Sequence, residues 1–260
     1  MEQRLHEHKY SIHIRRVIAL IITTLIITNC YAGLADSLQY ILRVGWNVGG
    51  TMPYGMSAEI RKLNSYGIEP TFSIGADAYK PLKAHWGVMV GLYVENKGMD
   101  VSATVKNYKT EMVRGGEKIS GNFTGRNDTE EATWAITIPV MATYDIAKNV
   151  RLKAGPMVSF IIGRKFEGMA YNGYIRIDDP TGAKVYIGTD SSTRGTYDFA
   201  DKLRRMQYGA RVGADWDFSH SWGAYVDVAL GFTGIFHSSF DSIEQTFYPI
   251  FATFGAKYNL

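Results

Sequence analysis

The chain has 260 residues, of which 20% are charged and 13% aromatic, and its formal net charge is +3. This near-neutral balance gives no support to nucleic-acid binding, and a single cysteine, Cys30, excludes a disulfide within the chain. No stretch contains the roughly 20 consecutive apolar residues that a membrane-spanning helix requires.

The N-terminal region has the features of a secretory signal peptide. An apolar run at 17–28 follows three basic residues, and small residues precede a cleavage point after Ala32. We therefore predict a cleaved signal peptide at 1–32 and a single domain at 33–260. Cleavage would remove four of the 28 basic and two of the 25 acidic residues and lower the net charge from +3 to +1. The alternative is a lipoprotein acylated at Cys30, although Asn29 stands where a small residue is needed.

From Leu42 onwards, apolar and polar residues alternate with the period of two that is typical of β-strands. In each of eight segments the even-numbered residues are the apolar ones, and they include all five tryptophans. The segments are 42–49, 72–79, 86–95, 134–144, 152–162, 208–216, 222–232 and 247–260.

The connections between these segments alternate in length. Short links lie near 81–85, 147–149 and 218–221, and long ones cover 50–67, 99–133, 165–205 and 235–246. The pattern predicts an all-β fold, an eight-stranded antiparallel up-and-down transmembrane β-barrel with short periplasmic turns and long extracellular loops. Because an unpaired strand edge cannot be hydrated in lipid, the last strand must pair with the first.

A soluble barrel or sandwich would alternate equally well. However, a face in contact with bulk water should carry many charged side chains, whereas the odd-numbered positions here are rich in glycine, for example Gly87, Gly91 and Gly213. Glycine at this density indicates a crowded interior. Pro139 and Pro156 of the fourth and fifth strands would lie almost opposite each other in a hairpin centred near Ala147 and Lys148, and we expect a shared break in pairing there.

Two sets of residues follow from this register. The predicted inward-facing polar network comprises Arg43, Asp77, Glu95, Lys153, Arg211, Asp215, Asp227 and Lys257. The predicted aromatic girdles at the membrane interfaces comprise Trp86, Trp216, Trp222 and Tyr258 at the turn side and Trp134 and Tyr248 at the loop side. The network is either a polar conduit or a set of buried ion pairs that fills a narrow barrel.

Four short motifs resemble the PorT-like outer-membrane β-barrel family over roughly residues 40–260. They are Glu59 to Gly67, Val94 to Met99, Ile138-Pro139-Val140 and Ala154-Gly155-Pro156. The resemblance implies an outer-membrane barrel in the bacterial envelope, and one member of the family takes part in protein secretion. An accessory role beside envelope or secretion proteins is therefore an expectation.

We expect a non-catalytic, monomeric, multi-pass barrel embedded in outer-membrane lipid, with a structural or accessory role and no cofactor or metal. One alternative comes from His237, Ser239 and Glu244, which resemble the histidine, serine and glutamate of outer-membrane lipid A deacylases. Because residues two apart in a strand share a face, His237 could activate Ser239 as a nucleophile. The other is a narrow pore. The long segment 165–205, with four tyrosines, suits either partner contact or a self-packed extension of the strands.

Overall fold

The computed structural model describes residues 38–53, 58–67, 69, 71–177, 180–240, 242–243 and 246–260. The predicted signal peptide and its cleavage point lie outside the described residues. The chain divides into Met1–Leu38 and Gln39–Leu260, and everything below concerns the second unit.

Within the described residues, all regular structure is β-strand apart from one short 3₁₀ helix. The elements are β1 (Gln39–Met52), β2 (Ile60–Gly67), β3 (Thr71–Pro81), β4 (Trp86–Arg114), β5 (Glu117–Ala147), β6 (Val150–Ile177), β7 (Lys184–Ile187), β8 (Gly195–Asp198), η2 (Ala200–Lys202), β9 (Met206–Asp217), β10 (Trp222–Gly231) and β11 (Tyr248–Asn259). The predicted all-β class is confirmed, and the short links at 82–85, 148–149 and 218–221 fall where the sequence placed them.

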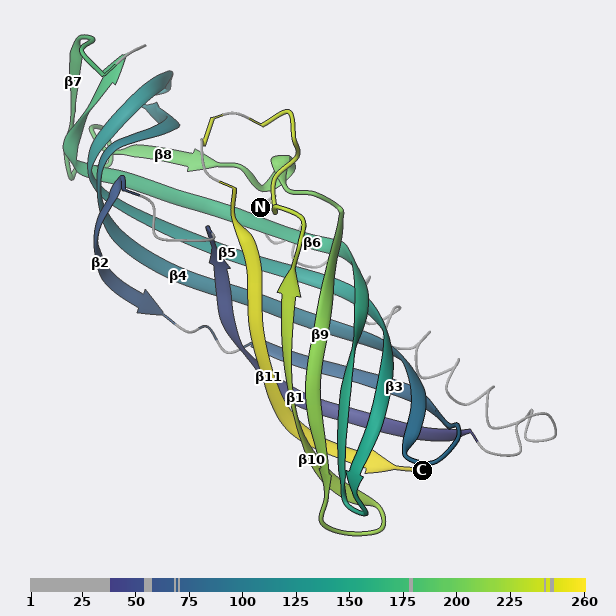
Figure 1. Cartoon of the computed structure of the whole chain (residues 1–260). Coiled ribbons are helices and arrows are strands. Elements are labelled where there is room, and N and C mark those ends of the chain that lie inside the picture. Colours follow the sequence, from purple (N-terminus) through teal and green to yellow (C-terminus); the bar gives the residue numbers. More distant parts are fainter. Residues whose placement is uncertain are drawn as a thin grey trace, which may run out of the picture. The chain divides into compact units, whose positions relative to one another are not determined.

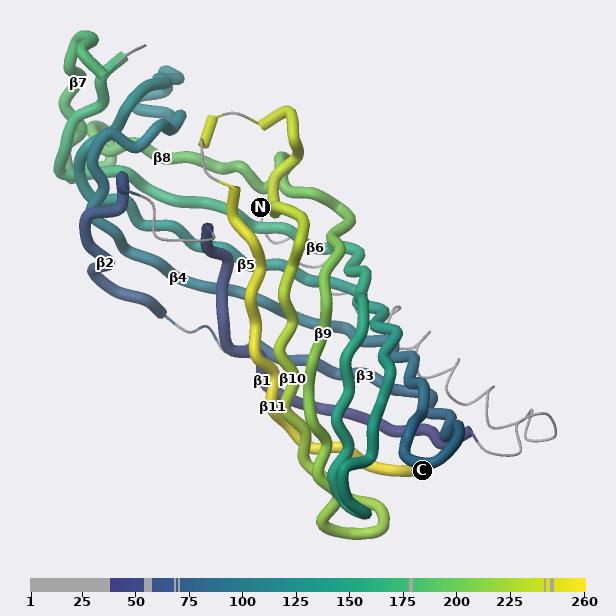
Figure 2. Tube along the Cα trace, in the orientation of Figure 1, coloured from purple at the N-terminus to yellow at the C-terminus, as the bar shows by residue number. Residues whose placement is uncertain are grey.

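Eleven strands form one sheet in which neighbouring strands run antiparallel. Eight of them pair in the order β4-β3-β1-β11-β10-β9-β6-β5, and β5 pairs with β4 again, so that the pairing returns to its starting strand. These eight strands are called the strand ring below (Figure 1). As expected, the last strand pairs with the first, from Ile41 opposite Asn259 to Met52 opposite Tyr248, and Figure 2 shows β1 and β11 side by side.

The pleat of the ring strands separates two kinds of surface. On β1, for example, Arg43 is 2% exposed while its neighbour Val44 is 53% exposed. The same holds along β9, where Arg211 and Asp215 are buried and Val212 and Trp216 are exposed. The odd-numbered side chains therefore lie on the buried inner face of the ring, and the apolar even-numbered ones lie on its outer face.

The two prolines interrupt the strand pairing as predicted. Between β5 and β6 the regular pairs stop at Pro139 opposite Met157 and resume at Ala142 opposite Ala154. The pairing of β4 with β5 also skips residues between Val90 and Tyr93. Because proline has no N–H to donate, each proline removes one ladder bond at this point.

The long extracellular loops predicted at 99–133 and 165–205 are corrected by the structure. β4 and β5 continue as a hairpin to a two-residue turn at Gly115 and Gly116, whose φ values are +59° and +87°. A turn with two residues of positive φ matches the twist of a hairpin and favours glycine. β6 extends beside this hairpin to Ile177, and the short strands β2, β7 and β8 pair with the extended strands.

The part of β4 beyond Gly98, of β5 before Thr133 and of β6 beyond Arg164, together with β2, β7 and β8, is called the extension below. It continues past the ends of β1, β9, β10 and β11 (Figure 1). Two of its register shifts lie side by side, between Val105 and Tyr108 in the pairing of β4 with β5 and between Thr124 and Arg126 in the pairing of β5 with β6. Such bulges bend a sheet and reverse which side chains face inwards, so that Val105 and Tyr108 are both buried.

The extension has a hydrophobic core of its own. This core includes Phe123 of β5, Phe166 of β6 and Tyr197 of β8, and the connection between β10 and β11 adds Phe236 and Ile243. Of the two alternatives for 165–205, a self-packed extension therefore describes the arrangement, although Tyr186 stays 71% exposed. Asp178 and Asp179 of this segment lie outside the described residues.

Candidate functional site

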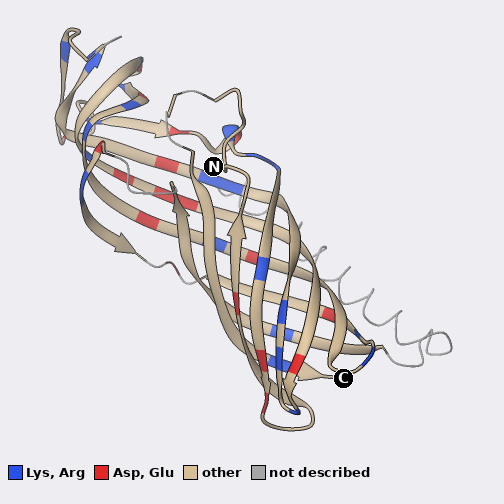
Figure 3. Ribbon diagram, in the orientation of Figure 1, with Lys and Arg blue, Asp and Glu red and all other residues tan. Residues whose placement is uncertain are grey.

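The structure brings the eight predicted polar-network residues together on the inner face of the strand ring. Each of them is at most 2% exposed: Arg43, Asp77, Glu95, Lys153, Arg211, Asp215, Asp227 and Lys257. They come from seven of the eight ring strands, and Figure 3 shows that the basic and acidic residues on these strands are intermixed. A buried charge is tolerated only when opposite charges and hydrogen bonds compensate it. The way in which these charges pair therefore determines whether the interior is a filled core or a polar conduit.

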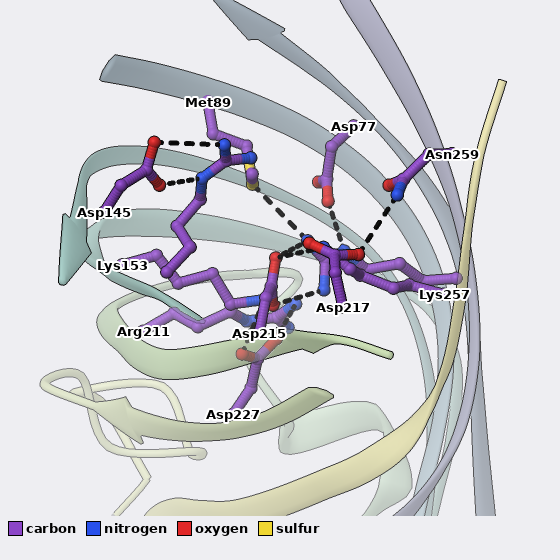
Figure 4. Close-up of polar contacts among 12 residues, drawn as sticks. Asp77, Met89, Asp145, Lys153, Arg211, Asp215, Asp217, Asp227, Lys257 and Asn259 are labelled. Carbon is purple, nitrogen blue, oxygen red and sulfur yellow. Dashed lines mark hydrogen bonds and ion pairs between the residues drawn. The ribbon is translucent and has the colours of Figure 1, made fainter. Parts of the chain in front are cut away.

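Asp215 of β9 is the centre of the network (Figure 4). Its two carboxylate oxygens accept hydrogen bonds from both terminal nitrogens of Arg43, at 2.8 and 2.6 Å. Lys153 lies 2.9 Å from Asp215 and Lys257 lies 3.5 Å from it. One carboxylate thus serves three cations, which reach it from β1, β6 and β11.

Asp77 and Asp227 balance the remaining positive charge around this centre. Asp77 accepts a hydrogen bond from Nε of Arg43 and another from the Tyr93 hydroxyl, at 2.7 Å. Asp227 lies 2.8 Å from Nζ of Lys153. The bidentate pair of Arg43 with Asp215 therefore has further partners on both sides, which fixes its geometry.

Glu95 of β4 forms the second node, nearer the extension. It pairs with Arg211, lies 2.8 Å from Nζ of Lys97, and accepts a hydrogen bond from the Thr137 hydroxyl at 2.7 Å. Arg211 also approaches Asp227, at 4.0 Å, which links the two nodes. The network therefore extends along and across the interior of the ring.

The sequence reasoning missed several members of this network. Aromatic rings cover its cations, with the guanidinium of Arg211 4.6 Å from the ring centre of Tyr93 and that of Arg43 4.9 Å from that of Tyr225. Lys97 and Asp217, the latter 2.9 Å from Lys257, were also missed. All four are odd-numbered. Tyr93 and Tyr225 lie within the predicted segments 86–95 and 222–232, and Lys97 and Asp217 lie one or two residues beyond the ends of 86–95 and 208–216, so the same register, continued, would have placed them on the inner face.

The predicted girdle residues lie on or near the outer face, at both ends of the ring. Trp86 and Trp222 are about half exposed and form edge-to-face pairs with Tyr144 and Tyr258, both with 4.9 Å between ring centres. Trp216, near the same end, is similarly exposed. At the opposite end Trp134 packs edge-on against Phe72 at 5.3 Å, and Tyr248 is partly buried.

The structure describes only two of the three proposed catalytic residues. His237 and Ser239 are exposed residues of the connection between β10 and β11, and among the described residues no hydrogen bond joins their side chains. The backbone N–H of His237 instead donates to the carbonyl of Lys202, at 3.0 Å. Glu244 lies outside the described residues, so the catalytic hypothesis stays untested.

Two further features are absent from the described residues. No group of three or more His, Cys, Asp or Glu side chains there has a geometry that could hold a metal ion. None of the described helical residues forms a helix long and apolar enough to span a membrane.

Comparison with known proteins identifies one family. The family model described as "Outer membrane protein beta-barrel domain" matches residues 34–237. The search of curated proteins gave no match.

Three solved structures illustrate the structural comparison. Ail, the attachment invasion locus protein of Yersinia pestis, in complex with the heparin analogue sucrose octasulfate, is 10% identical, with 86% of this chain and 99% of that chain covered and a TM-score of 0.39. The translocator domain of autotransporter NalP from Neisseria meningitidis is 8% identical, with 95% and 96% covered and a TM-score of 0.25. The Ralstonia pickettii toluene transporter TbuX is 9% identical, with 86% and 90% covered and a TM-score of 0.24. TM-scores of this size support no argument about function.

Proposed function

Because the chain belongs to the family of outer membrane protein β-barrel domains, we propose that its strand ring is a closed, eight-stranded barrel that spans the bacterial outer membrane. The outer face of the ring supports this proposal, since Val44, Ile74 and Val226 are each about half exposed and would contact lipid. Exposed apolar side chains over so many strands are unfavourable in water and favourable in lipid. In β5 the spanning part would run from Trp134 to Tyr144.

The proposed role of this barrel is to anchor the extension, without conduction or catalysis. The observation that carries the proposal is the buried ion-pair network, because it joins side chains from strands all around the ring across its interior. Five cations and five anions take part, namely Arg43, Lys97, Lys153, Arg211 and Lys257 with Asp77, Glu95, Asp215, Asp217 and Asp227. An eight-stranded barrel leaves an interior just wide enough for side chains to fill.

We expect the purified protein to show no steady conductance in planar lipid bilayers, whereas a porin prepared in the same way conducts. The double variant Glu95→Ala/Arg211→Ala removes a matched pair of charges and is expected to open a leak. The control is Glu111→Ala/Lys118→Ala, which removes an ion pair of the extension with a 69% exposed lysine and should leave the bilayer tight. Uniform conductance steps from the unmodified protein would overturn the anchoring role in favour of a pore.

The extension is the surface through which such an anchor would act on partners. It carries its own hydrophobic core, so it can hold a defined shape outside the membrane. The resemblance to PorT-like proteins suggests envelope or secretion proteins as partners, in an accessory role. Rigid surfaces presented by a scaffold commonly carry recognition.

The partner hypothesis is tested by gentle-detergent purification of the tagged protein from its native membrane. We expect an envelope protein to co-purify in stoichiometric amount, and its recovery should fall when the exposed residues Arg126 and Lys109 of the extension are changed to Glu. The matched control is Lys148→Glu, because Lys148 is also an exposed lysine but lies in the short turn at the opposite end. Recovery of the protein alone would contradict an accessory role.

A further inference from the structure

A cavity of about 450 Å³ lies where the extension meets the end of the strand ring. Its walls come from the extended parts of β4, β5 and β6, from β2 and β8, from the last residues of β1 and from the connection that precedes β11. Its volume falls within the range of small-molecule sites, about 300–1,000 Å³. Protein interiors otherwise contain few voids larger than a water molecule, so a hollow of this size is more than imperfect packing.

The walls of this cavity are mainly apolar and belong to the core of the extension. Met99, Val105, Phe166 and Ile243 line it, and each is less than a tenth exposed. Aromatic, aliphatic and thioether groups offer dispersion contacts to an apolar ligand and tolerate some variation in its shape. A hollow with such walls does not hold water well.

Three polar side chains that line the cavity, Asn127, Thr129 and Tyr197, hydrogen-bond to one another and carry no charge. The Tyr197 hydroxyl accepts a hydrogen bond from Nδ2 of Asn127 at 3.0 Å and lies 2.7 Å from the hydroxyl of Thr129. Burial raises the pKa of Tyr197 to about 12, so its phenol stays neutral. A charged ligand would find no counter-ion among these groups, and burying an unpaired charge is costly.

The cavity has an entrance at the outer face, where the pairing of β1 with β3 has ended. The regular pairing of β1 with β3 ends at Asn47 opposite Thr71, whereas β1 itself continues to Met52. Met52, Leu63 and Tyr66 line the cavity beyond this point and are 39–49% exposed. Met99 and Thr51 also line the cavity and are nearly fully buried.

We propose that this cavity is a binding site for one neutral, mainly apolar molecule or chain with at most one hydrogen-bonding group. The source is either a diffusible apolar compound or an acyl chain of an outer-membrane lipid, because the exposed apolar rim continues from the lipid-facing surface of β1. The site is independent of the ion-pair network and of any partner of the extension.

The test uses the full-length mature protein in lipid nanodiscs with ¹³C-labelled methionine methyl groups. In the first arm, titration with 1-naphthol should shift the methyl signal of Met99 saturably, because the naphthol ring would lie against it. Met89 and Met141, which are fully buried in a separate cluster of the strand ring, should not shift. In the second arm, without naphthol, cross-relaxation between the Met99 methyl group and lipid acyl protons would identify a lipid chain as the occupant.

Ala103→Phe places a ring in the cavity, since Ala103 lines it and is 6% exposed. This variant should reduce the response of Met99 at least tenfold in both arms, and the milder Ala103→Leu should reduce it in part. Ala256→Phe adds the same ring to the outer face of β11 and should leave the response unchanged. Unchanged Met89 and Met141 signals show that each variant is folded. The proposal is wrong if Met99 responds in neither arm, or if Ala103→Phe and Ala103→Leu both leave its response intact.

Discussion

Asp215→Asn is expected to lower the free energy of unfolding by about 3–5 kcal/mol, which is typical when one member of a buried ion pair is removed. Asp215 is completely buried, and its carboxylate serves Arg43, Lys153 and Lys257. The neutral amide would leave an excess positive charge in the interior of the ring. The amide also replaces an acceptor oxygen by an NH₂ group that points at cations. The loss of unfolding free energy should therefore exceed the loss expected for one hydrogen bond.

Urea unfolding in lipid vesicles, followed by tryptophan fluorescence, measures this change. Asp217→Asn is the matched control, because Asp217 lies two residues further along β9, pairs with Lys257 and has a side chain that is 28% exposed. Asp217→Asn should lower the free energy of unfolding by no more than about 1 kcal/mol, as expected for an ion pair that is accessible to solvent. Equal losses for the two variants would mean that burial does not set the strength of this network.

The strands of the ring could be predicted from the sequence because their side chains obey a period of two over their whole length. That period put Arg43 and Asp215 on one face and Val44 and Trp216 on the other, and burial in the structure follows the same division. The short turn between the fourth and fifth strands also placed Pro139 and Pro156 almost opposite each other, and in the structure Pro139 lies opposite Met157, the neighbour of Pro156. Which side chains of a strand face inwards depends only on the alternation within that strand, so it can be read from the residues of the strand itself.

The extension could not be predicted in the same way, since its bulges reverse the register. Val105 and Tyr108 are both buried although one is odd-numbered and the other even-numbered. A strict alternation therefore breaks down near Asn107, whose φ of +58° marks the irregularity. The pair Gly115-Gly116 was a usable signal, because adjacent glycines between alternating segments favour a two-residue hairpin turn.

The identity of the ion-pair partners also lay beyond the sequence. Arg43 and Asp215 are separated by 172 residues and meet only because the ring strands are staggered by particular amounts. The stagger depends on every strand pair around the ring, whereas the sequence pattern describes one strand at a time. The pattern thus predicted the set of charged residues but not which of them form pairs.

The stability of the protein is expected to fall as the pH rises from about 4.5 to 7, because of Glu131. This residue lies three positions outside the proposed spanning part of β5, is 4% exposed and accepts a hydrogen bond from the Thr51 hydroxyl. Burial raises the pKa of Glu131 from 4.5 to about 7. The folded state therefore favours the protonated carboxyl. This preference contributes fully to the free energy of unfolding below pH 4.5, and the contribution is lost as the pH rises through 7.

A pKa difference of this size corresponds to about 3 kcal/mol between pH 4 and pH 8. Glu131→Gln keeps the shape of the protonated group and cannot ionise, so its unfolding free energy should lack this part of the pH dependence and exceed that of the unmodified protein at pH 8. Glu111→Gln is the control, because Glu111 is partly exposed and paired with Lys118, and it should retain the full dependence. Urea unfolding could instead show that Glu131→Gln loses as much unfolding free energy between pH 4 and pH 8 as the unmodified protein does. Another group would then cause the pH dependence, and burial of Glu131 would not penalise its charged form.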